Sequence, residues 1–287
     1  MRHWACVNGT LMPAEEARVS VFDAGFMQGI GLFETLRAYA GRLFRLERHL
    51  DRLRQSARKL GWTVLPDADV MADNVQQVLR ATASADARVR LTVTTGSLHA
   101  DAADTPVLTV VATAAPGGKY PDECYKKGVT VVVADCRQNP TDPTIGHKTT
   151  SYFARLAALR QAHAAGAFEA LWFTADDTLA EGAISNVFAV RDEVLVTAPL
   201  DTPVLPGITR AAVLELAGRL DIPTRDERLT LDELLAADEV FLTNSMAEVV
   251  PVVRVGRHAI GDEKPGEITR RLGLAYGELV EQEAGRA

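Results

Sequence analysis

One segment of the 287-residue sequence combines residue types that could bind a phosphate. Gly207, Ile208 and Thr209 follow Leu205-Pro206 and begin a run with the apolar spacing of a helix. A helix N-terminus presents unpaired backbone N–H groups and a partial positive charge, and glycine lets an anion approach the backbone closely. The segment therefore fits a phosphate site, although a Pro-Gly turn with a Thr in the first helical turn would have the same sequence.

A lysine that could attack a carbonyl carbon is Lys148, in the segment IGHKTT, which follows the irregular residues 138–144. If its side chain is shielded from water, the amine pKa falls and the amine becomes a nucleophile. The alternative is a lysine on the surface, which is the usual place for this residue type.

Other polar residues lie close to predicted helices and strands. Glu181 precedes a strand, where a carboxylate could hold a proton on a heterocyclic nitrogen or simply flank a turn. Arg52 is next to the apolar stripe of a helix and could reach an anion or extend into solvent. Thr243-Asn244-Ser245 ends a strand, where small polar residues line many α/β sites and also form ordinary turns.

Short strands and helices alternate along the chain, which predicts an α/β fold. The Asn8-Gly9 and Ala40-Gly41 pairs predict hairpin turns within 3–12 and 32–46. Leucines at spacings of three and four predict a helix over 46–60. We predict further helices over 68–81, 149–166, 208–220, 231–237 and 265–281, and further strands over 87–95, 106–112, 128–134, 168–174, 187–190, 194–197, 239–243 and 249–255.

The segment PGGKYP, residues 116–121, interrupts every periodic pattern and indicates a linker. We therefore predict a small N-terminal α/β domain over 1–115, an interdomain linker over 116–123 and a larger C-terminal domain over 124–287. Ligands of two-domain proteins are usually bound between the domains.

Composition argues against several classes of partner. The net charge is -7 and no long basic run occurs, so we do not expect nucleic acid as a partner. No apolar window is long enough for a membrane span, and the N-terminus lacks the pattern of a signal peptide. Cys6, Cys124 and Cys136 have no metal-ligand spacing and indicate free thiols in a reducing compartment. We expect a cytoplasmic protein with no metal site.

Eight motifs in one order carry a family resemblance over nearly the whole chain. The motifs are VNGTLMP, FDAGFMQGIGLFETLRAY, RLERHLDRL, HKTTSY, EGAISNVF, LPGITR, ADEVFLTN and EVVPV. In this order the chain resembles the fold-type IV pyridoxal 5'-phosphate (PLP) enzymes of the class IV aminotransferase family. That family includes branched-chain and D-amino-acid aminotransferases and aminodeoxychorismate lyases. The resemblance implies the D-amino-acid-aminotransferase-like fold, an α/β (α+β) two-domain arrangement with PLP between the domains, and a homodimer.

The resemblance also implies roles for individual residues. Lys148 matches the lysine that holds PLP as a Schiff base and then transfers a proton during catalysis. Glu181 matches the acid paired with the pyridine nitrogen, and Arg52 matches an arginine that binds the cofactor phosphate. The remaining cofactor contacts that it implies are Leu205 against the ring, and Gly207, Ile208, Thr209 and Ser245 at the phosphate.

Two reactions share this set of residues. GIGLFETLR and TNSMAEVVPV look more like the lyases, and Thr35 matches a lyase active-site threonine. The Arg-x-His carboxylate-binding motif of D-amino-acid enzymes is missing from residues 96–100. We predict a transaminase that moves an amino group between an amino acid or primary amine and a 2-keto acid, because this is the commoner activity. The alternatives are 4-amino-4-deoxychorismate lyase, which releases pyruvate to give 4-aminobenzoate, and a non-catalytic PLP-binding relative.

Substrate contacts are predicted from strands and loops around the expected site. Arg37 and Arg90 could meet a substrate carboxylate or be charges on a strand surface. The full candidate set is Thr35, Arg37, Arg90, His99, Met246 and Ala247. Tyr152 lies one residue closer to Lys148 than the branched-chain tyrosine does.

Overall fold

The computed structural model describes residues 3–98 and 107–285, which form two compact units. Unit 1 contains residues up to Gly118, the segment 147–151 and the end of the chain from Val280, and unit 2 contains the remainder. The domain boundaries 1–115 and 124–287 remain a prediction. Two short segments from later in the sequence, 147–151 and the end of the chain from Val280, pack with the N-terminal part of the chain.

Unit 1 is built on an antiparallel sheet, whose described strands follow the order β2-β1-β6-β5-β3-β4. Both predicted hairpin turns are confirmed. Asn8 and Gly9 have φ values of 48° and 83°, and Ala40 and Gly41 have 48° and 75°, as a two-residue hairpin loop with two left-handed residues requires. The strands are β1 (Trp4–Val7), β2 (Thr10–Pro13), β3 (Gly31–Tyr39), β4 (Arg42–Leu43), β5 (Ala87–Thr94) and β6 (Thr109–Pro116).

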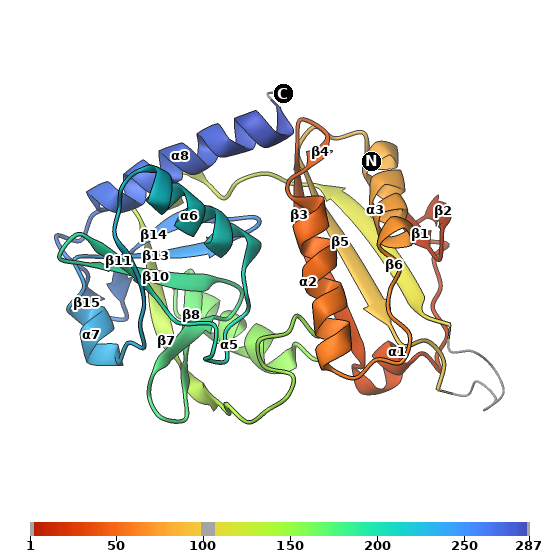
Figure 1. Cartoon of the computed structure of the whole chain (residues 1–287), viewed down its shortest axis with the longest axis horizontal. Coiled ribbons are helices and arrows are strands. Elements are labelled where there is room, and N and C mark those ends of the chain that lie inside the picture. Colours follow the sequence, from red (N-terminus) through yellow and green to blue (C-terminus); the bar gives the residue numbers. More distant parts are fainter. Residues whose placement is uncertain (1–2, 99–106, 286–287) are drawn as a thin grey trace. The chain divides into compact units, whose positions relative to one another are not determined.

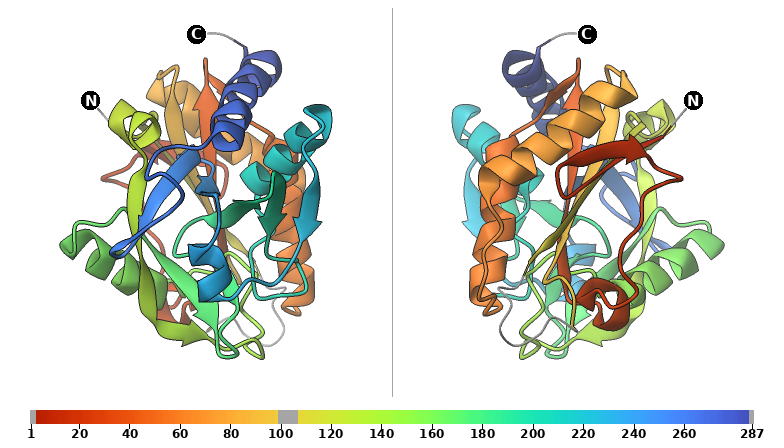
Figure 2. Two further views of the ribbon diagram at one scale, coloured as in Figure 1. Left: turned by 90° about the vertical axis from the view of Figure 1, so that its left-hand side faces the viewer. Right: turned by 90° about the vertical axis from the view of Figure 1, so that its right-hand side faces the viewer.

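Two helices of unit 1, α2 (Leu46–Lys59) and α3 (Ala68–Thr82), cover one face of this sheet (Figures 1 and 2). Their apolar stripes pack against inward-facing strand residues such as Leu36 and Leu91. Because successive strand residues point to opposite faces, Phe33, Thr35 and Arg37 of β3 lie on the face away from these helices. A short helix, α1 (Ala24–Gln28), precedes β3 and was not predicted.

The predicted helix over 149–166 is wrong in its first part. The helix α5 (Phe153–Ala164) begins later, and Thr149 instead pairs with Leu32 at the edge of β3. Phe33 N–H donates to the Lys148 carbonyl at 2.8 Å, and Thr150 N–H donates to the Gly31 carbonyl at 2.8 Å. Two β-branched threonines favour this extended conformation. β4 pairs only with the far end of β3, which leaves the beginning of this strand edge open to residues 148–150.

Unit 2 is built on a mixed sheet with the described order β12-β11-β10-β13-β14-β7-β8-β9, in which β15 also pairs with β14. The strands β14, β7 and β8 are parallel to one another, and most other neighbours are antiparallel. The strands are β7 (Val129–Gln138), β8 (Glu169–Thr174), β9 (Leu179–Gly182), β10 (Asn186–Arg191), β11 (Val194–Thr197), β12 (Thr224–Asp226), β13 (Glu239–Asn244), β14 (Glu248–Val255) and β15 (His258–Ala259).

Helices of unit 2 lie over different strands of its sheet (Figure 2, left). α5 packs on β7 and β8, whereas α6 (Ile208–Arg219) packs on β13. The predicted helix over 231–237 is α7 (Leu231–Leu235), which Thr230 caps through a reciprocal capping box with Glu233. The other helices are α4 (Asp122–Lys126) and α8 (Glu267–Ala284), whose last turn is part of unit 1.

Several element boundaries differ from the prediction. β6 continues to Pro116, and α4 begins at Asp122, inside the segment predicted to be the linker. The short elements α1, α4, β9, β12 and β15 were not predicted, because runs of two to five residues carry too little periodicity. Within residues 3–98 and 107–285, no helix is both long and apolar enough to cross a bilayer.

Candidate active site

Lys148 is the first residue of the segment that pairs with β3 in unit 1. Its ammonium nitrogen lies 4.6 Å from the centre of the Phe33 ring, and its backbone carbonyl accepts from Phe33 N–H. The side chain is half-buried. The backbone bonds of residues 148–150 fix where this side chain begins, and the ring of Phe33 supports its end.

A buried ionic cluster lies on the opposite side of β3, where the strand meets α2. Glu34 Oε1 accepts from Arg52 Nε at 2.8 Å and Glu34 Oε2 accepts from Arg52 Nη2 at 2.5 Å. His49 Nδ1 lies 2.7 Å from Glu34 Oε2. Glu34 and His49 are 1% exposed and Arg52 is 8% exposed, so all three side chains are buried. The negative charge of Glu34 is paired with the positive charge of Arg52 within unit 1. The guanidinium of Arg52 is thereby held in one orientation.

The pKa values in this cluster follow from burial and pairing. Burial would raise the pKa of Glu34, but the charge of Arg52 and the contact with His49 outweigh it and lower this pKa to about 2. Burial lowers the pKa of His49, although Glu34 opposes the shift, and the charges of Arg52 and Lys148 lower it further. Glu34 is therefore ionised at neutral pH.

The predicted substrate residues Thr35, Arg37 and Arg90 lie on β3 and β5, and Thr35 is paired with Arg90 across the two strands. The guanidinium of Arg90 stacks on the Phe33 ring at 3.8 Å, on the ring that also contacts Lys148. Arg37 is 3% exposed and forms two hydrogen bonds with Asp86, of 3.1 and 2.8 Å. This pairing favours a structural role for Arg37, whereas Arg90 lies beside the lysine. His99 lies outside the described residues.

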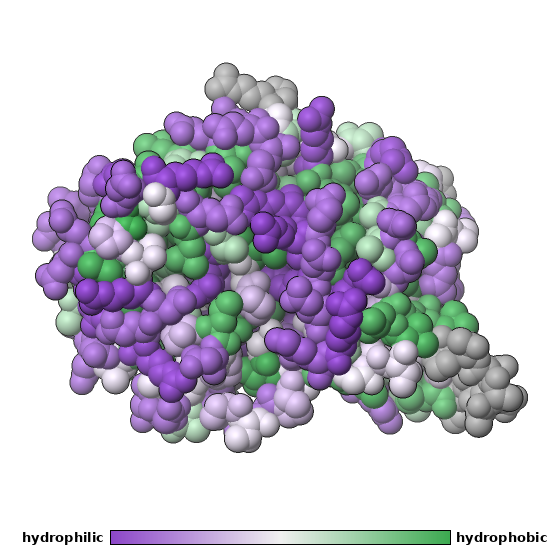
Figure 3. All heavy atoms as spheres, in the orientation of Figure 1, coloured by the Kyte–Doolittle hydropathy of each residue, from purple (hydrophilic) through white to green (hydrophobic). Residues whose placement is uncertain are grey.

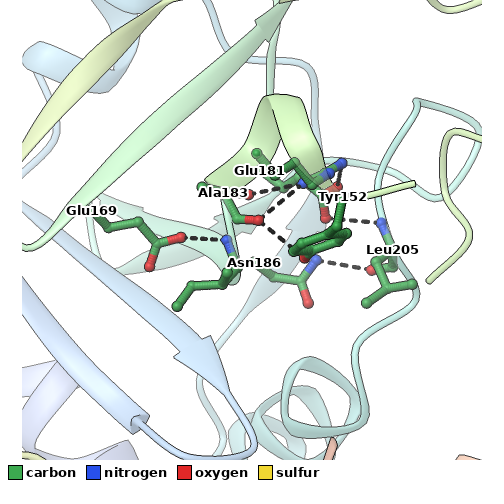
Figure 4. Close-up of polar contacts among 9 residues, drawn as sticks. Tyr152, Glu169, Glu181, Ala183, Asn186 and Leu205 are labelled. Carbon is green, nitrogen blue, oxygen red and sulfur yellow. Dashed lines mark hydrogen bonds and ion pairs between the residues drawn. The ribbon is translucent and has the colours of Figure 1, made fainter. Parts of the chain in front are cut away.

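In unit 2, Glu181 is a buried carboxylate at the end of β9, with 3% exposure (Figure 4). Its Oε1 contacts Arg155 Nη2 of α5 at 2.5 Å, and its Oε2 accepts from Leu205 N–H at 3.0 Å. Tyr152 donates to the Ala183 carbonyl next to it at 3.1 Å. Both carboxylate oxygens are therefore oriented by neighbouring donors.

The LPGIT segment begins α6 as predicted, with Gly207 as the N-cap residue in an extended conformation. No side-chain cap bonds the first turn among the described residues, so its N–H groups stay available for an anion. Asn186 Nδ2 donates to the Leu205 carbonyl at 2.9 Å. A Cβ on Gly207 would lie 2.0 Å from Asn186 Oδ1, so any larger residue here would have to displace the Asn186 amide. Thr209 is 3% exposed in the same turn.

Ser245, Met246 and Ala247 form the turn between β13 and β14. Asn244 Oδ1 accepts from Met246 N–H at 2.9 Å and from Ala247 N–H at 2.7 Å, which shapes the turn. The hydroxyl of Thr243 is buried and has no hydrogen-bond partner among the described residues. This unsatisfied hydroxyl lies two residues before Ser245 in the chain.

A second buried carboxylate, Glu169 on β8, holds the turn that follows Glu181. It accepts from Ile184 N–H at 2.7 Å and from the Ser185 hydroxyl at 2.5 Å. Burial raises its pKa to about 7, and the nearby charge of Glu181 adds to the rise while these hydrogen bonds oppose it.

The sequence alone did not single out Glu34, Glu169, Arg155 or Asn186. The two glutamates carried one usable signal, a charged residue inside an apolar strand run, which indicates a paired buried charge. Arg155 and Asn186 carried none, because helical arginines and turn asparagines are common on surfaces.

The family model for class IV aminotransferases matches residues 31–255. A putative branched-chain-amino-acid aminotransferase of Methanocaldococcus jannaschii is 36% identical over 93% of this chain and 92% of its own length. The aminodeoxychorismate lyase of Bacillus subtilis is 30% identical over 98% of this chain and 97% of its own. A T.th. branched-chain amino acid aminotransferase, solved with pyridoxamine 5'-phosphate, has a TM-score of 0.89 and 29% identity, covering 100% of this chain and 96% of that one.

These similarities cover almost the whole chain and include both the sequence and the fold. The solved relative carries the amine form of PLP, so the cofactor of this family is PLP. The relatives include aminotransferases and a lyase of the same fold. The chain belongs to the class IV aminotransferase family of PLP-dependent enzymes.

Proposed function

We propose that this enzyme is a transaminase that moves an amino group between an amino acid or primary amine and a 2-keto acid, with Lys148 as the residue that bonds PLP. The observation that carries the proposal is the placement of Lys148, whose backbone is hydrogen-bonded to β3 and whose amine rests on Phe33. A nucleophilic lysine needs such a fixed, partly desolvated position.

The residues present fit PLP in chemical type. Unit 1 supplies an amine for its aldehyde and the oriented guanidinium of Arg52 for its phosphate. Unit 2 supplies the buried anion of Glu181 for its ring nitrogen, an uncapped helix start at Gly207 to Thr209 for its phosphate and the hydroxyl of Ser245. We propose that Leu205, whose backbone is bonded to both Glu181 and Asn186, packs against the ring.

When bound, PLP supplies an electron sink for the charge that develops on the substrate. The protein supplies the rest. Glu181 holds a proton at the ring nitrogen, so that the ring can accept this charge. The free amine of Lys148 would take the proton from the substrate Cα and deliver it to the cofactor carbon C4′, which is the proton movement that amino-group transfer requires. Arg52 and the α6 N-terminus each offer N–H donors of the kind that a phosphate accepts from.

For the substrate carboxylate we propose Arg90 with Thr35, since both lie on the strand face that carries Phe33. Arg37 is less suited, because Asp86 occupies two of its donors. We propose that Met246 and Ala247 border the substrate through the turn shaped by Asn244.

Aminodeoxychorismate lyase activity is the second candidate. It is supported by the Bacillus subtilis lyase, which aligns with 98% of this chain, and by Thr35 on the strand next to Lys148. The two activities differ in their products, although they use the same cofactor.

A half-reaction distinguishes the candidates. We expect the absorbance of the PLP-loaded enzyme to change to that of the amine form with one donor from a panel of amino acids and amines. We expect it to return on addition of a 2-keto acid. Pyruvate release from aminodeoxychorismate without a half-reaction with any donor would contradict transamination and establish the lyase. An enzyme that binds PLP and does neither would be the non-catalytic relative.

We also propose that the enzyme is a cytoplasmic homodimer. Unit 1 exposes Phe22, Phe26 and Met27 around α1, with Phe26 75% exposed, and Figure 3 shows apolar surface in this region. An exposed apolar patch of this kind suits contact with a second copy of the chain. Light scattering of the PLP-loaded enzyme is expected to give twice the mass of the chain, and a monomeric mass would contradict the proposal. The three free cysteines support a reducing compartment.

A further inference from the structure

Arg155, on the first turn of α5, is the ionic partner of Glu181. Its Nη2 contacts Glu181 Oε1 at 2.5 Å, and its Nη1 donates to the carbonyls of Gly182 at 3.2 Å and Ala183 at 3.4 Å. The side chain of Arg155 is 17% exposed and that of Glu181 is 5% exposed. The guanidinium therefore binds both the carboxylate and the backbone turn that follows it.

A second residue supports this arginine. With its amide oriented to satisfy its neighbours, Gln138 Oε1 accepts from Arg155 Nη2 at 2.8 Å and its Nε2 donates to the Pro203 carbonyl at 2.9 Å. Gln138 is 3% exposed. Arg155 is thus connected to β7, to the end of β9 and to the loop that carries Leu205.

The charge of Arg155 has a consequence for the carboxylate. A buried anion without a counter-charge is unfavourable, and a paired guanidinium offsets this cost. Burial lowers the pKa of Arg155, but Glu181 and Tyr152 raise it by more, so the arginine stays charged.

We propose that Arg155 is a positioning residue that pairs with Glu181 and holds its carboxylate in a single orientation toward the cofactor ring nitrogen. This inference rests on the proposed cofactor role of Glu181. The new element is that Glu181 acts as a pair with Arg155. Arg155 binds Glu181 Oε1, and Leu205 N–H donates to Glu181 Oε2. A merely structural ion pair would join α5 to β9 and would leave the cofactor unaffected.

The test uses Arg155→Met and Arg155→Lys in the full chain. Losing a hydrogen bond to a charged group corresponds to about tenfold or more in affinity. We expect Arg155→Met to raise the Kd for PLP about tenfold. NMR of ring-nitrogen-labelled PLP bound to this variant is expected to move toward the unprotonated signal at neutral pH. Arg155→Lys keeps the charge and is expected to fall between wild type and Met in both measurements.

The matched control is Arg137→Met, which removes another Arg–carboxylate contact of unit 2, the one with exposed Asp177. It is expected to leave the Kd and the nitrogen signal unchanged. A Kd within twofold of wild type and an unmoved nitrogen signal in Arg155→Met would overturn the proposal, whatever happens to the melting temperature. If Arg155→Met does not fold, Arg155→Lys decides by the same two measurements.

These readouts do not depend on which reaction the enzyme catalyses. A wild-type enzyme that binds PLP with a protonated ring nitrogen but fails every half-reaction would overturn the transaminase proposal and leave the Arg155 inference standing. A wild-type enzyme that transaminates, but whose nitrogen signal is unaffected by Arg155→Met, would support the transaminase proposal and overturn the Arg155 inference.

Discussion

Lys148→Ala is expected to lower turnover by about 10³-fold or more and to remove covalently held PLP. The lysine supplies both the covalent bond to the cofactor aldehyde and the amine that moves the substrate proton, so no other group replaces it. The fold should survive, because the hydrogen bond to β3 uses the backbone carbonyl of residue 148 and not its side chain.

Borohydride reduction followed by peptide mass spectrometry checks this prediction. In wild type, the mass of the reduced cofactor is expected on the peptide that contains Lys148, and the variant should carry none. Lys126→Ala is the matched control, since Lys126 is an exposed lysine that pairs only weakly with Asp122 one turn earlier. A Lys148→Ala enzyme with wild-type activity and absorbance would contradict the proposed mechanism.

Glu34→Gln is expected to destabilise the protein by about 3 kcal/mol at neutral pH, because the buried guanidinium of Arg52 loses its counter-charge. The same variant should weaken PLP binding about tenfold, since glutamine replaces one of the two carboxylate oxygens that accept from Arg52 and orient its side chain. Denaturant unfolding and a PLP titration measure the two effects.

The stability difference between wild type and Glu34→Gln is expected to depend on pH. The pKa of Glu34 is lowered from 4.5 to about 2, so its contribution to stability is present above pH 4.5 and is lost as the pH falls through about 2. The difference between wild type and Glu34→Gln should therefore shrink over that range. A constant difference between pH 5 and about pH 2 would contradict the assignment of the low pKa to Glu34.

Glu169→Gln is the matched control, because Glu169 is an equally buried glutamate with the opposite shift. Its pKa is raised from 4.5 to about 7, so its contribution is present below pH 4.5 and is lost as the pH rises through about 7. Relative to wild type, Glu169→Gln should gain stability as the pH rises over this range, which is the reverse of the low-pH behaviour of Glu34→Gln. The two profiles separate a specific charge effect from general damage to a buried strand.

Much of the fold and the family of this protein follow from the sequence by itself. The hairpin turns at Asn8-Gly9 and Ala40-Gly41, the helices α2, α3 and α6, and the capping box at Thr230 depend on residues within a few positions of one another. Turn conformation and helical periodicity are local properties, so a sequence reports them directly. The order of the motifs around Lys148, Glu181 and LPGIT likewise sufficed to identify the family.

Only the tertiary structure decided which distant segments pair through their backbones and which buried charges pair with one another. Thr149 was predicted to be helical, yet it lies in extended pairing with Leu32 because an edge of β3 more than a hundred residues earlier needs hydrogen-bond partners. The bonds of Glu34 to Arg52 and His49, and of Arg155 to Glu181, likewise join residues on different elements. A charge removed from water must find its counter-charge wherever packing brings one, and packing is not a local property of the chain.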